Sequence, residues 1–168
     1  MKFEDTYLND NILDALYDMR FEDCTPIQEK CIPEILDYND VIGVAQTGTG
    51  KTAAYLLPIL SMLDDGEYPK DAINCIIMSP TRELAQQIDQ AMQGFGYYLD
   101  SISSVAVYGG NDGNRYDQEM KSLRMGADVV IATPGRLLSH IRMGHIDLSK
   151  VSFFVLDEAD RMLDMGFS

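Results

Sequence analysis

Residues 41–52 read Val41-Ile-Gly-Val-Ala-Gln-Thr-Gly-Thr-Gly-Lys-Thr52 and set an apolar run directly against a glycine-rich segment. The apolar run predicts a strand over 41–45, and a helical pattern begins near Lys51. A glycine-rich turn between strand and helix points backbone N–H groups at one spot, where the helix dipole adds positive potential. The stretch therefore predicts a phosphate-binding turn in an α/β fold.

Further short apolar runs predict strands over 74–79, 104–108, 128–133 and 151–157. Between two of them, residues 81–99 carry one apolar stripe at helical spacing, formed by Leu84, Ile88, Ala91, Met92 and Phe95. Alternating strands and helices imply parallel strands joined by right-handed crossovers. The predicted fold class is α/β, with a largely parallel, doubly wound sheet and helices on both faces.

Two helices are predicted before the glycine-rich turn. Residues 9–19 carry an apolar face, with Asn9 or Asp10 as the N-cap. A second helix begins at Pro26, with Thr25 as its cap. Two prolines, Pro33 and Pro58, interrupt helical patterns and predict a kink or break near each.

Composition limits the class of protein. The 168 residues are 46% hydrophobic and 24% charged, which is typical of one folded domain. No apolar run approaches the roughly 20 residues that span a bilayer, and residues 1–5 lack the features of a signal peptide. We therefore expect a cytoplasmic protein without a membrane partner, whose three cysteines are reduced. A net charge of −14 argues against a broad basic surface for nucleic acid.

Two motifs predict a nucleotide site. The general phosphate-loop pattern G-x-x-x-x-G-K-[ST] assigns Lys51 to the β and γ phosphates and Thr52 to Mg²⁺, although Ala45 departs from its first glycine. The predicted strand over 151–157 ends in Asp157 and Glu158, which suit a Mg²⁺ shell and the polarisation of water. Taken singly, the motifs could instead be a flexible glycine-rich turn and an acidic helix N-terminus.

With these motifs in hand, the sequence resembles the DEAD-box RNA helicases over nearly its whole length, specifically their first RecA-like domain. The matching segments are Thr25-Pro26-Ile27-Gln28, 45–52, Pro80-Thr81-Arg82-Glu83-Leu84, Gly109-Gly110, Thr133-Pro134-Gly135-Arg136 and Asp157-Glu158-Ala159-Asp160. In this family the phosphate loop begins with alanine, so Ala45 fits. The resemblance implies an N-terminal RecA-like ATP-binding domain over 1–168 that is incomplete at its C-terminus, with residues 1–38 as flanking adenine-recognition helices.

The resemblance also implies ATP and Mg²⁺ as cofactors. The nucleotide residues it assigns are Phe21, Thr25, Gln28, Gln46, Thr47, Gly48, Thr49, Gly50, Lys51 and Thr52. It also assigns Lys51, Asp157 and Glu158 to catalysis and Thr52 and Asp157 to metal binding. Asp160 is assigned to the coupling of ATP hydrolysis to strand separation.

Adenine selection would fall to Gln28, whose amide can accept from adenine N6 and donate to N7. A plainly exposed helical glutamine is the alternative. Phe3 and Phe21 match the family's aromatics near the base. Arg20 stands where the family usually has glycine, and Cys24 where it often has proline, which leaves the shape of this loop open.

RNA contact is implied at three loops. The residues concerned are Pro80, Thr81, Arg82, Gly109, Gly110, Thr133, Pro134, Gly135 and Arg136. Thr81 and Gly135 each lie between a predicted strand and a predicted helix, where backbone N–H groups form anion sites. The arginines would either bind the ligand or hold neighbouring loops. Such contacts read phosphate and sugar rather than base sequence; the alternative is plain helix capping and tight turns.

The implied function is an ATP-dependent RNA helicase that opens short duplexes or remodels RNA–protein complexes. Two alternatives stay open: a P-loop motor acting on DNA, and a nucleotide-gated RNA-binding scaffold. Members of the family continue with a Ser-Ala-Thr motif and a second, C-terminal RecA-like domain that completes both sites.

Because that second domain supplies arginines to the γ-phosphate and half of the RNA site, the 168-residue chain alone is expected to bind adenine nucleotide weakly. It should also show little RNA-stimulated ATP hydrolysis. Phosphate release with and without RNA measures this, and robust RNA-dependent turnover by the chain alone would contradict the expectation.

Overall fold

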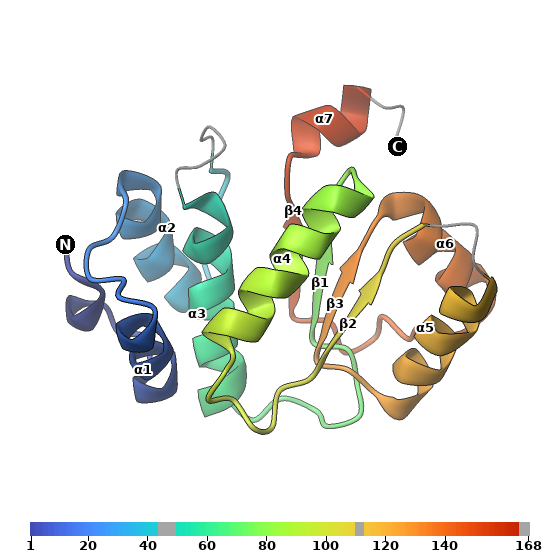
Figure 1. Ribbon diagram of the computed structural model, residues 1–168, viewed down its shortest axis with the longest axis horizontal. Helices are drawn as coiled ribbons and strands as arrows, with labels where there is room; N and C mark the ends of the chain where they lie inside the picture. The colour runs from blue at the N-terminus through green and yellow to red at the C-terminus, as the bar shows by residue number, and fades with distance from the viewer. Residues whose placement is uncertain (44–49, 110–112, 165–168) are drawn as a thin grey trace. The chain divides into compact units, whose positions relative to one another are not determined.

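The computed structural model describes residues 1–43, 50–109 and 113–164 (Figure 1). The chain divides into two compact units. Unit 1 comprises Met1–Glu67 and Ala91–Ile102, and unit 2 comprises Tyr68–Gln90 and Ser103–Ser168.

Unit 1 is built from helices. They are η1 (Phe3–Asp5), α1 (Asp10–Asp18), α2 (Pro26–Leu36) and α3 (Lys51–Asp65). Asn9 caps α1 as predicted, because its side chain accepts a hydrogen bond from Ile12 N at 3.0 Å. Pro26 opens α2 behind Thr25, also as predicted. The two helices α1 and α2 both pack on α3, which is almost wholly buried.

Two predictions about this part of the chain are contradicted in part. Helix α2 continues through Pro33 and α3 through Pro58, so neither proline breaks its helix. A proline removes one backbone hydrogen bond, and the buried apolar side chains of α3 offset that loss. The strand predicted over 41–45 is not found over 41–43, where Ile42 is 96% exposed; residues 44 and 45 lie outside the described residues. Apolar character alone does not make a strand without a neighbour to pair with.

Unit 2 contains a parallel sheet in the order β2-β3-β1-β4. Its strands are β1 (Cys75–Met78), β2 (Ser104–Val107), β3 (Val129–Ala132) and β4 (Phe153–Leu156). All four lie inside predicted runs, which confirms the α/β class and the parallel pairing. The helices between and after them are α4 (Arg82–Phe95), α5 (Gly113–Met125), α6 (Pro134–Arg142) and α7 (Ala159–Asp164), and α4 runs on into unit 1.

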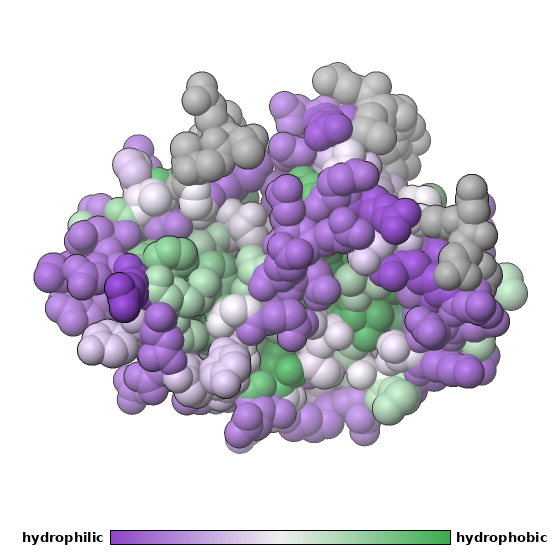
Figure 2. All heavy atoms as spheres, viewed as in Figure 1, coloured by the Kyte–Doolittle hydropathy of each residue, from purple (hydrophilic) through white to green (hydrophobic). Residues whose placement is uncertain are grey.

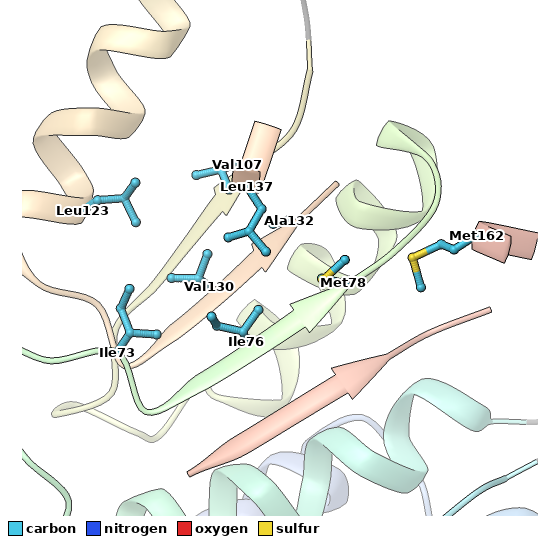
Figure 3. Close-up of a cluster of buried hydrophobic side chains, with 9 residues drawn as sticks. All are labelled: Ile73, Ile76, Met78, Val107, Leu123, Val130, Ala132, Leu137 and Met162. Atoms are coloured by element: carbon cyan, nitrogen blue, oxygen red, sulfur yellow. The ribbon is translucent and has the colours of Figure 1, made fainter. Parts of the chain in front are cut away.

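One face of the sheet forms a buried core with α5 and α6 (Figure 3). Ile76 and Val130 of the strands meet Leu123 of α5 and Leu137 of α6 there. Helix α4 lies behind β1 and β3 in that view, so helices cover both faces of the strands. Each fully buried aliphatic side chain contributes roughly 1.5–3 kcal/mol.

Helix α4 shows the amphipathic pattern that its sequence predicts. Ile88, Met92 and Phe95 are buried, whereas Gln87 and Gln90 are exposed. Figure 2 shows hydrophilic side chains along the outer side of this helix. Among residues 1–43, 50–109 and 113–164, no helix combines the length and the apolar composition of a bilayer-spanning segment.

The three cysteines are free thiols, as predicted. Cys75 lies on the innermost part of the sheet and is fully buried. Burial raises the pKa of its thiol far above the ordinary value, and burial also raises the pKa of Cys24 and Cys31.

The chain leaves α1 through a Schellman turn. Phe21 N donates to Leu16 O at 2.9 Å and Arg20 N donates to Tyr17 O at 3.0 Å. Arg20 takes a left-handed φ of 62° at the position where glycine is preferred. The chain thus keeps this turn with arginine in place of the family's glycine. Cys24, in place of proline, uses its N–H to bond Met1 O at 2.8 Å.

Replacing Arg20 with glycine should stabilise unit 1, because a side chain in the left-handed region costs roughly 1–2 kcal/mol and glycine removes that strain. Arg20→Gly is expected to raise the free energy of unfolding by about 1 kcal/mol, measured by urea denaturation followed by circular dichroism. Arg20→Ala is the matched control, since it removes the same side chain but keeps the strain. Equal stability of the two variants would contradict the prediction.

Candidate nucleotide and RNA interface

The described part of the glycine-rich turn begins at Gly50. This residue has a left-handed φ of 79° and is the N-cap of α3, so Lys51 and Thr52 are the first two residues of the helix. Both side chains are half-buried. The N–H groups of such a first turn are suited to an anion. Gln46, Thr47, Gly48 and Thr49 lie outside the described residues.

Gln28 joins the start of α2 to the start of α3. It is only 5% exposed, so the alternative of an exposed helical glutamine is wrong. Its Oε1 accepts from Thr25 N at 2.9 Å, and its Nε2 donates to Gly50 O at 3.1 Å. An amide has two donor hydrogens and two acceptor lone pairs, so one of each is left for a base. Gly50 has a left-handed φ of 79°, and a Cβ added there would lie 2.2 Å from Gln28 Nε2, so glycine is favoured at this position.

The two aromatic residues expected near the base differ in exposure. Phe3 is 4% exposed and belongs to the core of unit 1, where its N–H donates to Glu22 O at 2.9 Å. Phe21 is 46% exposed, and its ring centroid lies 6.4 Å from that of Phe95. Phe21 therefore offers an accessible ring face, and Phe3 holds the segment that carries it.

In unit 2 the strand register brings the predicted motif loops to one edge of the sheet. Met78 pairs with both Ala132 and Leu156, and Val107 also pairs with Ala132. The residues that follow these strand ends are Ser79, Tyr108, Thr133 and Asp157. Parallel strands end at the same edge, which is where open α/β sheets bind ligands.

The acidic motif follows β4 directly. Asp157 is 3% exposed, and its N–H continues the ladder to Met78 O at 2.9 Å. Glu158 is half-buried with a left-handed φ of 54°, and its Oε2 lies 3.5 Å from Arg161 Nη1. Asp160 is exposed in the first turn of α7. A strained backbone at a carboxylate beside a strand end is typical of functional sites.

In the three loops assigned to RNA, some residues cap helices and others leave the backbone exposed. Thr81 Oγ1 accepts from Leu84 N at 3.1 Å, so this threonine does cap α4. Gly109 N donates to Thr133 Oγ1 at 3.3 Å, which links two of the loops. Gly135 is exposed, and a Cβ placed there would meet nothing within 4 Å. Pro80 and Pro134 flank these residues, and Gly110 lies outside the described residues.

Three arginines gather around these loops in spite of the acidic composition. The guanidinium of Arg115 lies 3.7 Å from the ring centroid of Tyr108, and that of Arg82 lies 5.5 Å from the same ring. Arg136 lies 4.9 Å from the ring of Tyr116. Three cationic side chains thus lie close to the loops after β1, β2 and β3, although the whole chain carries a net charge of −14.

A buried carboxylate that the sequence analysis missed, Glu119 of α5, sits among these groups. Its Oε1 accepts from Arg136 Nε at 2.8 Å and from His140 Nε2 at 2.9 Å. Its Oε2 accepts from Tyr108 N at 3.3 Å. The spacing of Arg115 and Glu119 at i and i+4 could have predicted an ion pair on this helix. It could not have predicted the contacts of Glu119 with Arg136 and His140.

His140 is fully buried and has a second partner, His145. Their Nδ1 atoms lie 2.9 Å apart, and the Tyr116 ring stacks on His140 with centroids 4.3 Å apart. One nitrogen must donate and the other accept, so at least one ring is neutral. Partial burial, with smaller contributions from nearby His140 and Arg124, lowers the pKa of His145.

Comparison with known proteins gives a consistent picture. A model of the family described as DEAD/DEAH box helicase matches residues 25–168. The chain is 48% identical over 165 residues to the ATP-dependent RNA helicase DeaD of Escherichia coli (strain K12), covering 98% of this chain and 25% of that protein. It is 49% identical over 166 residues to DeaD of Haemophilus influenzae and 43% identical over 166 residues to DeaD of Mycobacterium tuberculosis (strain H37Rv). These alignments cover 98% and 99% of the chain but 26% and 28% of the relatives, so the chain spans about a quarter of their length.

The histidine pair predicts a loss of stability in acid. Because the pKa of His145 is lowered in the folded state, the unfolded chain binds an extra proton below its own pKa of about 6.5. The free energy of unfolding should therefore fall as the pH drops through about 6.5. His145→Asn, which cannot titrate, should flatten this dependence in urea denaturation between about pH 5 and pH 8. An unchanged pH dependence in the variant would contradict the assignment.

Proposed function

The chain belongs to the DEAD/DEAH box helicase family, and we propose from this that it is the N-terminal RecA-like part, over 1–168, of an ATP-dependent RNA helicase. In that protein, ATP binding and hydrolysis would drive the local opening of RNA duplexes or the remodelling of RNA–protein complexes. A C-terminal RecA-like domain would complete both sites, and the protein would act in the cytoplasm. The names of the bacterial relatives support the RNA helicase activity.

The nucleotide would be ATP with Mg²⁺. Lys51 and Thr52 at the start of α3 would hold phosphate and metal, because the helix begins there with a left-handed glycine. Gln28, buried and already bonded to the same turn, would select adenine beside the exposed ring of Phe21. The site would also include Thr25 and, from outside the described residues, Gln46, Thr47, Gly48 and Thr49.

Asp157 and Glu158 would supply the remaining chemistry. A buried carboxylate at the end of a parallel strand suits the water shell of Mg²⁺, which neutralises the charge that develops on the phosphates. Glu158 would orient and polarise the attacking water. Asp160, exposed on the next turn, would couple this step to the motion of the second domain.

The observation that carries RNA binding is the register of the parallel strands. All four strands end at one edge of the sheet, so the segments that follow them lie at that edge. These segments are 79–82, 108–109, 133–136 and residue 157. There, the exposed Gly135 and the arginines Arg82 and Arg136 offer backbone N–H groups and guanidinium groups to phosphates. Such contacts are independent of base sequence. Thr81, Gly109 and Thr133 would hold the shape of the loops, with Pro80, Pro134 and Gly110 beside them.

Glu158→Gln in the full-length protein tests the proposal. It removes the group that polarises water but keeps the shape, so turnover should fall about 10²–10⁴-fold while binding of ATP and of RNA persists. Glu67→Gln, at an exposed position, is the matched control. Phosphate release is measured with RNA and with DNA of the same length.

Three outcomes separate the candidate functions. Turnover that depends on RNA and is lost in Glu158→Gln supports the helicase. Equal stimulation by DNA would instead indicate a DNA translocase. Retention of cellular function by Glu158→Gln would indicate a nucleotide-gated RNA-binding scaffold.

A further inference from the structure

Glu119 is a charged side chain in a place where charge is costly. It is 4% exposed on the inner side of α5, and both carboxylate oxygens are used. A buried carboxylate is tolerated only when it is paired and fully hydrogen-bonded, and such pairs have a fixed geometry. The side chain is therefore held in one position relative to its partners.

Those partners come from the residue after β2, from α6 and from α5 itself. Tyr108, whose N–H donates to Glu119, directly follows β2 and precedes Gly109. Arg136 lies in the first turn of α6. Arg115 Nε lies 3.5 Å from Glu119 Oε2. Gly109 N in turn donates to Thr133 Oγ1. One carboxylate thus ties the loop after β2 to the loop after β3, and both loops are among those proposed to contact RNA.

The contact also orients the Arg136 guanidinium. Nε faces Glu119 at 2.8 Å, and the Tyr116 ring lies 4.9 Å from the guanidinium carbon. Nη2 is buried and has no hydrogen-bond partner among the described residues. The Arg136 side chain is 13% exposed, so only the accessible part of its guanidinium is open to a second anion, and a planar guanidinium suits phosphate.

We propose that Glu119 is a positioning residue for RNA binding, acting through Arg136 and the Tyr108–Gly109 backbone. The inference rests on the RNA-binding function proposed above. The carboxylate holds Arg136 in the conformation that receives an RNA phosphate, so the side-chain entropy of the arginine is lost during folding rather than during binding. Arg82 and Arg115 both lie against the Tyr108 ring, so cationic groups remain beside the network that holds Arg136.

The test is a double-mutant cycle in the full-length protein with Glu119→Gln, Arg136→Gln and the double variant. The probe is a fluorescein-labelled oligouridylate, titrated in the presence of a non-hydrolysable ATP analogue, and the KM for ATP is measured alongside. Asp117→Asn, which removes an exposed carboxylate from the same helix, is the control.

Glu119→Gln should weaken RNA binding about tenfold. The KM for ATP should change less than about twofold, because Glu119 acts only on the RNA contacts. The double variant should lose less affinity than the sum of the two single losses, since both changes remove the Arg136 phosphate contact. The dependence of log K on log salt should be shallower by about one unit in all three variants but unchanged in Asp117→Asn.

Several results would overturn the inference. Additive losses in the double variant, or a rise in the KM for ATP parallel to the loss of RNA binding, would mean that Glu119 serves only the fold. If Glu119→Gln does not fold, Glu119→Asp keeps the charge and shortens the reach by one methylene, and native RNA affinity in that variant would also overturn it. If the native protein binds RNA and Glu119→Gln has no effect on that binding, the role of Glu119 is refuted but the proposed function is not. Absence of RNA binding by the native protein refutes the proposed function as well.

Discussion

The parallel register of four short strands is the constraint on which the rest of unit 2 depends. Because Met78 pairs with both Ala132 and Leu156, and Ala132 with Val107, all four strands end at one level. Every following residue then emerges at the same edge of the sheet. Motifs far apart in the sequence become neighbours there, with no long connection needed to bring them together. The loops themselves can vary so long as the buried aliphatic residues of the strands keep the register.

The second constraint is the balance of charge at that edge. To bind a polyanion, an acidic protein would have to collect its cations locally, and Arg82 and Arg115 both lie against the ring of Tyr108. Neighbouring arginines repel one another, and the buried carboxylate of Glu119 offsets this repulsion because it pairs with Arg115 and Arg136. Removing one partner from a buried ion pair typically costs about 3–5 kcal/mol, so this arrangement is sensitive to substitution. The same network includes His140, which hydrogen-bonds both Glu119 and His145.

The sequence predicts those features of the structure that depend on residues close to one another along the chain. Four of the predicted strands, the apolar stripe of α4 and the N-caps at Asn9 and Thr25 follow from local periodicity and local hydrogen bonding, and the structure confirms them. The expected break at Pro58 is wrong because burial of α3 outweighs one lost hydrogen bond. Glu119 could not be found in this way, since its partners Arg136 and His140 lie 17 and 21 residues away and meet it only when the sheet forms. The roles of Lys51, Asp157 and the RNA loops stay predictions, supported by position and family.

RNA is proposed to bind along the carboxyl edge of this sheet. Hydrogen–deuterium exchange of the full-length protein, with and without oligouridylate and a non-hydrolysable ATP analogue, tests it directly because exchange is resolved along the backbone. The account predicts that RNA slows exchange at 79–82, 108–109 and 133–136, and leaves the amides of α1 unchanged. Protection by RNA confined to other segments, with these three loops exchanging at their ligand-free rates, would contradict it.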